Sequence, residues 1–290
     1  MIALTVALAV LVGVSLGLLG GGGSILTVPL LAYVAGMDAK QAIATSLLVV
    51  GATSAVGAIS HARAGRVQWR TGLVFGVAGM AGAYGGGLLG HYIPGSVLLL
   101  GFAAMMIATA IAMLRGRKNA APDSSAHHIP VFKVIAEGLV VGLVTGLVGA
   151  GGGFLVVPAL ALLGGLSMPV AVGTSLIVIA MKSFAGLAGY LTSVAIDWPV
   201  AIMITIAAIV GAMLGARLTA LVNPESLRVA FGWFVLAMSS VILGEELHPA
   251  VGLAAAGVTA VAAVVYFTCP RAAYCPTRRL SRRDTALTAT

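Results

Sequence analysis

Long apolar segments recur along the whole chain and are separated by short polar breaks. An α-helix needs about 20 apolar residues to cross the hydrocarbon core of a bilayer, and most of these segments are close to that length. A transmembrane barrel would instead show alternating segments of about 10 residues, and no such alternation is evident. The pattern predicts single spans at residues 39–61, 70–90, 95–114, 168–192, 198–219, 226–243 and 249–268, and two-legged segments at 2–19 with 25–35 and at 132–148 with 154–164.

Both two-legged segments are interrupted by a cluster of glycines. Residues Gly17 to Pro29 (GLLGGGGSILTVP) return 129 positions later as Gly146 to Pro158 (GLVGAGGGFLVVP). A continuous helix is disfavoured there, because each glycine costs ~1 kcal/mol and each proline ~3 kcal/mol relative to alanine. Inside a membrane, the backbone groups freed by such a break are tolerated only where they are buried in protein or line a cavity. We therefore predict that Pro29 and Pro158 mark helix breaks and that both clusters are substrate sites.

The composition indicates a membrane protein. Hydrophobic residues make up 60% of the chain and charged residues 8%, with a mean hydropathy of +1.11, which is typical of helical membrane spans and not of a soluble domain. The first residues lack the basic region of a secretory signal peptide, so we expect residues 1–19 to belong to the mature protein. The net charge is +8, but the basic residues lie at span ends and in the tail, where they set orientation. We therefore expect a lipid bilayer and no nucleic acid as partner.

Similarity between the two halves of the chain extends well beyond the glycine clusters. At the same offset, matched positions include Thr45-Ser46-Leu47 with Thr174-Ser175-Leu176, Trp69 with Trp198, Gly82 with Gly211 and Gly86 with Gly215. So many matches in register indicate a duplication, and duplicated halves with interrupted helices are typical of secondary transporters. We predict a first transmembrane repeat at 1–114, a linker at 115–130, a second repeat at 131–244, an additional helix at 245–268 and a basic tail at 269–290.

The lysines and arginines predict the relative orientation of the two repeats. If both repeats insert the same way round, 7 of these residues face the cytoplasm and 8 face the outside. If the second repeat is inverted, 14 face the cytoplasm, Lys40 alone faces the outside and Lys182 lies within a span. Cytoplasmic loops carry an excess of Lys and Arg, so the distribution favours inversion, with the N-terminus outside and the linker and C-terminus in the cytoplasm. The predicted fold is an all-α polytopic helical membrane protein with two inverted repeats, each opening with a glycine-broken helical hairpin.

Inversion requires each two-legged segment to return to the side from which it came. Legs shorter than about 20 residues fit a hairpin that turns inside the membrane, so that the two glycine turns approach each other near the midplane. In the alternative, each leg crosses fully as a short helix, and the orientation of the repeats is unchanged.

The glycine turns suit an oxyanion for two reasons. Glycine lets backbone N–H groups approach a ligand closely and adopts positive φ, and the helix that follows offers free N–H donors and about half a positive charge. The alternative is that the glycines only allow close helix packing, which is the role that we predict for the regularly spaced glycines between Gly72 and Gly90. The candidate ligands are Gly20, Gly21, Gly22, Gly23 and Ser24 in the first turn and Gly149, Ala150, Gly151, Gly152 and Gly153 in the second.

Hydroxyl side chains follow each hairpin by one to two helical turns. Thr45 and Ser46 occupy this position in the first repeat, and Thr174 and Ser175 occupy it in the second. Their hydroxyls could donate to the same anion, or could bond back to a carbonyl of their own helix. Both interpretations remain open from the sequence.

Lys182 lies 14 residues into its predicted span, close to the bilayer centre, with no acidic residue evident as its partner. An intramembrane charge marks a functional site by default, so Lys182 is a candidate for binding an anion. The alternative is that its side chain extends along the helix to the membrane interface. His61 and Glu137 remain as candidates for a proton-coupling group. The alternative for His61, which ends its span beside Arg63, is a residue at the membrane interface.

The repeated Gly-Leu-x-Gly-x-Gly-Gly-x-x-x-x-x-Pro motif, its place at the start of each half and the following Ala-x-x-Thr-Ser-Leu resemble the TauE/SafE family of sulfite exporters. The similarity covers nearly all of residues 1–268, and one departure is Ala150, where the first copy has Gly21. The resemblance implies an anion permease of the bacterial inner membrane for sulfite or a small organosulfonate such as sulfoacetate, often an exporter. Members of the family differ in substrate, so the resemblance assigns no single anion.

The predicted function is secondary transport of a sulfur oxyanion that binds near the midplane between the two glycine turns. The alternative is an uncoupled anion channel, since a channel could share the duplication, the helix breaks and the central lysine. We do not expect an enzyme, because no cluster of His, Cys, Asp or Glu lies within the predicted spans to hold a metal or transfer protons. We predict no catalytic residue, no metal and no cofactor, and the sequence leaves the oligomeric state undetermined.

Overall fold

The computed structural model of the chain describes residues 2–19, 24–115, 131–149, 156, 160, 168–218 and 224–268. Regular structure within these ranges is helical throughout. The elements are α1 (Ile2–Leu19), α2 (Thr27–Pro29), the π-helix η2 (Leu30–Val34), α3 (Ala39–Arg63), α4 (Trp69–Gly90), α5 (Gly95–Arg115), α6 (Val131–Val148), α8 (Met168–Tyr190), α9 (Trp198–Leu218), α10 (Pro224–Glu246) and α11 (Pro249–Thr268). Each predicted span boundary in the described ranges lies within three residues of an observed helix end.

Within the described residues, seven helices are long and apolar enough to cross a membrane, namely α3, α4, α5, α8, α9, α10 and α11. Shorter apolar stretches form parts of α1 and α6 and the segment Ser24–Val34. The predicted class, a polytopic helical membrane protein, is therefore confirmed. The inverted arrangement of the repeats stays a prediction.

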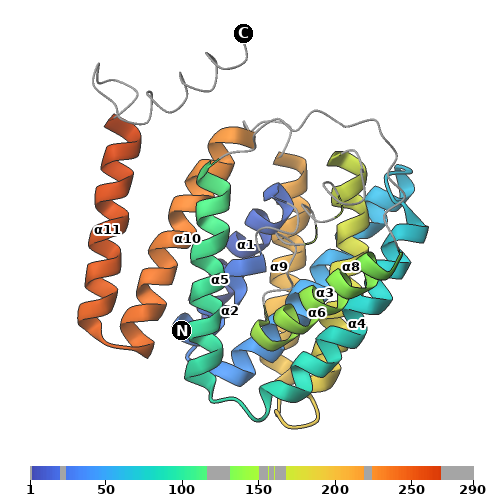
Figure 1. Ribbon diagram of the computed structural model, residues 1–290, viewed down its shortest axis with the longest axis horizontal. Helices are drawn as coiled ribbons and strands as arrows, with labels where there is room; N and C mark the ends of the chain where they lie inside the picture. Colours follow the sequence, from blue (N-terminus) through green and yellow to red (C-terminus); the bar gives the residue numbers. More distant parts are fainter. Residues whose placement is uncertain are drawn as a thin grey trace, which may run out of the picture.

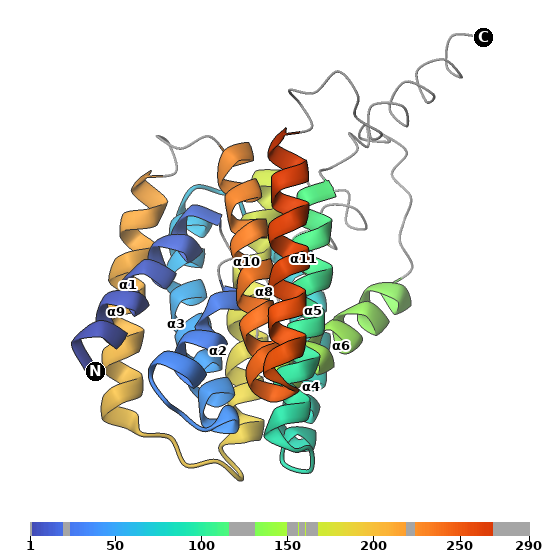
Figure 2. The same ribbon diagram turned by 90° about the vertical axis from the view of Figure 1, so that its left-hand side faces the viewer.

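Helices α3 and α8 cross at the centre of the bundle (Figures 1 and 2) and run in opposite directions. Gly51 of α3 lies against Ser183 and Phe184 of α8, whereas Gly57, further along α3, lies against the earlier residue Leu176. Thr53 and Lys182 occupy equivalent positions in the two halves, and both lie at the height of this crossing.

Glycines build two further interfaces, in each of which a first hairpin leg packs on a helix of the other half. Helix α1 runs parallel to α9, and α6 runs parallel to α4. A Cβ added at any of these glycines would collide with a backbone carbonyl of the facing helix, so only glycine allows the helices to approach this closely. The glycines are Gly13, Gly17, Gly211 and Gly215 in the first interface and Gly142, Gly146, Gly82 and Gly86 in the second, and they match pairwise at the repeat offset.

The glycines of α4 confirm the predicted role in helix contact, with one refinement. Gly82 and Gly86 face α6, whereas Gly72, Gly76 and Gly90 face side chains of α8. The series therefore serves two neighbouring helices and not a single face.

Helix α11 lies at the periphery of the bundle, against α10 (Figure 1). Its outer face is apolar and exposed, as at Leu253, which is 74% exposed, and Val258, which is 70% exposed. The division of the chain into two repeats, a linker, this additional helix and a tail stays a prediction.

The two ends of the bundle differ in charge. The α3–α4 connection and the C-terminal ends of α9 and α11 lie at one end, and the α4–α5, α8–α9 and α10–α11 connections lie at the other (Figures 1 and 2). We call the first the basic end, because it carries Arg63, Arg66, Arg70 and Arg217. At the opposite end, Lys40 donates a hydrogen bond of 2.8 Å to the His91 carbonyl oxygen, and the Tyr33 hydroxyl donates one of 3.1 Å to Glu246. Which end faces the cytoplasm stays a prediction.

Candidate functional site

The second glycine turn begins at Gly149, where α6 ends. Gly149 has φ of +75°, and its N–H donates to the Thr145 carbonyl oxygen at 2.9 Å, which is a common way to end a helix. A Cβ added here would lie 2.7 Å from Cγ2 of Ile43, so both the backbone conformation and the close packing require glycine. The Ser46 hydroxyl donates to the Gly149 carbonyl oxygen. Ser46 therefore holds the turn against α3, which is neither of the two roles expected from the sequence.

The second glycine turn starts near the end of the bundle that lies opposite the basic end, and not at the height of the α3–α8 crossing. Along α4, Gly138 of α6 lies beside Phe75 and Gly146 lies beside Ala83. At the end of α6, the Leu147 carbonyl oxygen accepts a hydrogen bond of 2.6 Å from the hydroxyl of Tyr190, the last residue of α8. Helix α6 thus runs alongside α4 between Phe75 and Gly86, on an oblique course through the bundle (Figures 1 and 2). Whether this leg crosses the membrane fully or turns inside it stays a prediction.

The remaining residues of the second turn, Ala150 and Gly151 to Gly153, lie outside the described residues, as does Pro158. Gly20 to Gly23 of the first turn also lie outside them. The approach of the two turns to each other is therefore untested, and their role as ligands stays a prediction.

The first turn is followed by a helical leg that Pro29 does not end. Ser24 and Thr27 at its start are buried, and the Thr27 hydroxyl has no hydrogen-bond partner within the described ranges. The α-helical pattern stops at Pro29 and continues as the π-helix η2. Proline lacks an N–H and disturbs the regular ladder, so the expected break is corrected to a change of helix type at this residue.

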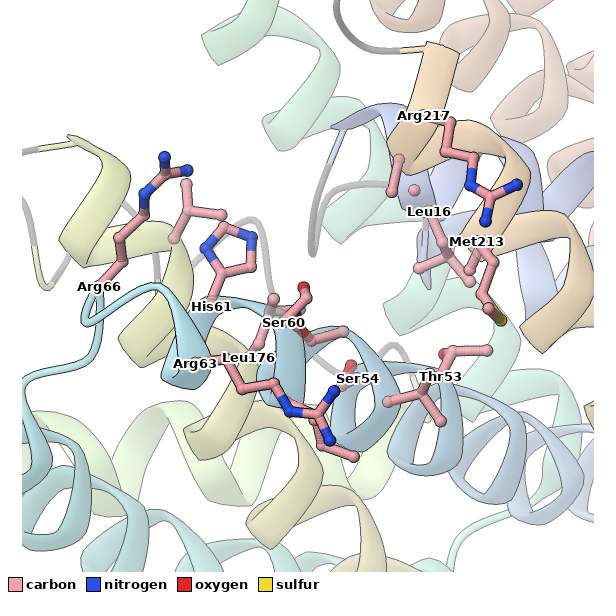
Figure 3. A pocket seen from close by; sticks show the side chains of 17 residues that line it. Leu16, Thr53, Ser54, Ser60, His61, Arg63, Arg66, Leu176, Met213 and Arg217 are labelled. Carbon is pink, nitrogen blue, oxygen red and sulfur yellow. Dashed lines mark hydrogen bonds between the residues drawn. The ribbon is translucent and has the colours of Figure 1, made fainter.

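A cavity of about 720 Å³ opens at the basic end of the bundle, between α1, α3, α8 and α9 (Figure 3). We call it the basic cavity. Gly17 of the first glycine motif contributes to its wall, and Thr53 and Ser54 of α3 lie on its floor. Val172 and Leu176 from the start of α8 also line it. The cavity therefore lies where the two halves of the chain meet.

Three arginines and His61 surround the basic cavity. His61 and Arg66 stand on one side and Arg217 on the other, with Arg63 on α3 below them (Figure 3). Ring nitrogen Nδ1 of His61 is buried, and none of the residues that the structure describes forms a hydrogen bond with it. None of the residues that line the cavity in the described part of the chain is acidic. The arrangement can attract an anion, because no carboxylate neutralises the guanidinium groups.

Lys182 is buried at the centre of the bundle. Its side chain is 1% exposed, and within the described part of the chain its Nζ atom has no hydrogen-bond partner. Its methylene groups lie beside Gly79 of α4. The hydroxyl of the next residue, Ser183, is also buried and has no partner among the described residues. The alternative in which Lys182 extends to the interface is therefore wrong, since Nζ does not reach the surface.

The hydroxyl residues are not brought together. Because α3 and α8 run in opposite directions, Thr45 and Ser46 lie toward the opposite end, and Thr174 and Ser175 lie toward the basic end. Ser175 bonds back to the Val172 carbonyl oxygen at 2.8 Å. The Thr174 hydroxyl accepts a hydrogen bond of 3.0 Å from the N–H of Gln68, in the α3–α4 connection. Back-bonding is confirmed only for Ser175.

Sequence reasoning did not place Arg63, Arg66 or Arg217 in a site. The distribution of lysine and arginine put all three on one side of the membrane, which was the available signal. Their convergence on one cavity depends on how α3 and α9 pack across the two halves. His61 and Tyr190 are also equivalent at the repeat offset, but only the fold shows that one lines a cavity and the other is buried.

Comparison with known proteins gives one family. The family model described as "Sulfite exporter TauE/SafE" matches residues 5–243. A "Probable membrane transporter protein" of Xylella fastidiosa (strain 9a5c) is 36% identical over 239 residues, which covers 80% of this chain and 91% of that protein. A similarly named protein of Bacillus subtilis (strain 168) is 29% identical over 223 residues, covering 76% and 91%. Another from Methanocaldococcus jannaschii is 28% identical over 243 residues, covering 77% and 89%. No solved structure matches the chain significantly.

Proposed function

The chain belongs to the TauE/SafE family of sulfite exporters and is a membrane transporter, and we propose that it carries sulfite or a small organosulfonate across the bacterial inner membrane. In this proposal the N-terminus lies outside, the basic end lies in the cytoplasm and export is the working direction. The family description supports the class of anion. The arginines at the basic end, among them Arg63, Arg66, Arg70 and Arg217, support the orientation, since cytoplasmic loops are enriched in such residues.

One observation carries the proposal: Lys182, at the crossing of the two halves, is buried without a hydrogen-bond partner among the residues that the structure describes. Burying an ammonium group without a partner costs several kcal/mol, and such a charge inside a membrane marks a functional site by default. A transported anion would supply the missing partner during part of the cycle. The neighbouring Ser183 hydroxyl, also buried and unpartnered, offers a second donor for an oxyanion.

The packing of the two halves supports secondary transport by inverted repeats. The α1–α9 and α4–α6 interfaces use equivalent glycines, and the equivalent helices α3 and α8 run in opposite directions. In transporters of this kind one half rocks against the other around a fixed site. The cavity at the basic end and the packed Tyr190 at the opposite end favour this cycle over an uncoupled channel, which would need access from both ends.

The two glycine turns remain part of the proposed site, in different ways. Gly17, which precedes the first turn, lines the basic cavity. Gly149, which begins the second, packs against Ile43 and is held by Ser46. We therefore expect the first turn to contact the anion in the conformation that is open at the basic end.

The deciding experiment is uptake of sulfite, sulfate, sulfoacetate and thiosulfate into proteoliposomes, with Lys182→Met as the test variant. Loss of a hydrogen bond to a charged group, ~1.5 to 3 kcal/mol, should raise the KM of the true substrate by roughly tenfold to over a hundredfold. Lys40→Met is the matched control, because Lys40 lies at the opposite end and its Nζ donates to the backbone carbonyl oxygen of His91. An unchanged KM in well-folded Lys182→Met protein would remove Lys182 from the site. Counter-transport between the two sides distinguishes a carrier from a channel.

The orientation is tested separately with single cysteines at Asp197 and Ala120 and a membrane-impermeant maleimide added outside intact cells. The native Cys269 and Cys275 are first replaced by serine. The proposal expects labelling at Asp197, in the α8–α9 connection of the opposite end, and none at Ala120 in the linker. Equal labelling of the two positions contradicts the inverted arrangement.

A further inference from the structure

The basic cavity and Lys182 are distinct places in the fold. Lys182 is not among the residues that line the cavity, and it lies beside Gly79 of α4, whereas the cavity lies on the side of α3 that faces α1 and α9. An anion at the rim of the cavity would meet different side chains from an anion at Lys182. The cavity therefore needs its own functional explanation.

The cavity has the chemistry of a site for oxyanions. Arg63, Arg66 and Arg217 bring guanidinium groups from two elements of the first half and one element of the second. A guanidinium group is planar, permanently charged and weakly hydrated, and it binds oxyanions through two parallel N–H donors. Ser54 and the unpaired Nδ1 of His61 add uncharged polar atoms to the wall.

The size of the cavity indicates how tightly it holds its ligand. Its volume of about 720 Å³ is far larger than the ~30 Å³ that one water molecule occupies in the liquid. A small oxyanion would therefore be taken up with much of its hydration shell and would be held mainly by charge. Such a site concentrates an anion without binding it strongly.

We propose that the basic cavity is a loading site, which captures a hydrated sulfur oxyanion at the basic end before the anion moves to Lys182. The inference rests on the proposed function, and it adds Arg63, Arg217 and His61 to the residues that recognise the substrate. A cleft lined by charge of one sign and walled by apolar groups focuses its field, which raises the local concentration of the counter-ion and its rate of arrival by roughly 10- to 1,000-fold. Because the capture is electrostatic and the arginines are exposed, added salt weakens it.

The test is the KM for sulfite uptake into proteoliposomes at low and high concentrations of sodium gluconate. Wild-type KM should rise with salt. The double variant Arg63→Gln/Arg217→Gln should show a KM about tenfold higher at low salt, with little further dependence on salt. The substituted residues are exposed, so the variant should fold, and its melting temperature verifies this.

Two control variants distinguish capture in the cavity from a general effect of charge at the basic end and from binding at Lys182. Arg70→Gln removes an exposed arginine at the same end that does not line the cavity, and it should retain the wild-type KM and salt dependence. Lys182→Met should raise the KM but keep the salt dependence, because the loading site is intact. A wild-type KM in the double variant, or an equal increase in Arg70→Gln, overturns the loading site and leaves the proposed function standing. An unaffected Lys182→Met protein overturns the site of the proposed function instead.

The anionic group that the cavity holds could also come from a lipid headgroup. The same measurements are therefore made in liposomes of phosphatidylcholine alone and in liposomes that also contain phosphatidylglycerol. The loading site predicts the same effect of Arg63→Gln/Arg217→Gln in both. An effect that appears only with phosphatidylglycerol assigns the cavity to lipid and contradicts the proposal.

Discussion

The two ends of the bundle carry equivalent positions that are packed differently. His61 and Tyr190 are separated by the repeat offset of 129 residues, and each lies at the end of a central helix. His61 lines the open basic cavity, whereas Tyr190 is fully buried and its hydroxyl bonds to the Leu147 carbonyl oxygen. A large side chain thus closes at one end the position that is open at the other. The same helical arrangement, present in two copies, therefore leaves a cavity open at the basic end while the equivalent place at the other end is filled.

The difference between the ends extends to the floor of the cavity. Ser54 lines the basic cavity, while its equivalent Ser183 is buried and unpaired. The neighbouring equivalents, Thr53 and Lys182, lie at the level of the α3–α8 crossing and differ in charge. The two halves therefore share the arrangement of their helices, but they differ in the polar side chains at equivalent positions.

We expect the greatest loss of stability from substitutions in the glycine interfaces that the two halves share. Gly82→Ala and Gly211→Ala each place a methyl group against a carbonyl of the facing helix, and overpacking of this kind costs ~1 to 3 kcal/mol. Both variants should lose thermal stability by similar amounts, as measured by melting of the purified protein. Gly85→Ala is the control on the same helix, because a Cβ added at Gly85 meets nothing within 4 Å. Equal melting temperatures for Gly82→Ala and Gly85→Ala would contradict the packing described for the two interfaces.

An intermediate effect is expected at the closed end. Tyr190→Phe removes the hydrogen bond to Leu147, worth about 1 kcal/mol net, and should increase opening of this end about fivefold. The measurement is the rate at which a maleimide labels a cysteine introduced at Leu147, with Cys269 and Cys275 replaced by serine. Tyr92→Phe is the control, because Tyr92 lies at the same end and is 80% exposed. An unchanged labelling rate in Tyr190→Phe would mean that this hydroxyl does not keep the end closed.

The smallest expected effect separates the two equivalent serines. Ser46→Ala removes the bond that ties the second glycine turn to α3, and should destabilise the protein by about 0.5 to 1 kcal/mol. Ser175→Ala removes only a bond to its own helix, which contributes little to helix stability. Thermal melting of the two purified variants makes the comparison. Ser175→Ala melting at or below the temperature of Ser46→Ala would show that the turn does not depend on Ser46.

Hydropathy along the sequence was sufficient to assign the class of the protein and the limits of its helices. A membrane span is recognised by the length of an apolar segment, which is a local property, so the limits of helices such as α3 and α9 follow from hydropathy alone. The duplication was equally visible, because glycines that let two backbones touch recur at fixed spacing. Lys182 also stood out, since a charge in the middle of an apolar segment is conspicuous before any neighbour is known.

The contacts of the candidate site residues depend on how the helices pack, and the sequence did not show them. Arg66 and Arg217 lie far apart along the chain, and only the packing of α9 beside α1 and α3 places them around one cavity. The depth of the second glycine turn was decided by the parallel course of α6 along α4, because the length of a leg says nothing of where its end lies. The role of Ser46 was decided in the same way: its hydroxyl was expected to face an anion or its own helix, and the fold placed the carbonyl of Gly149 within its reach.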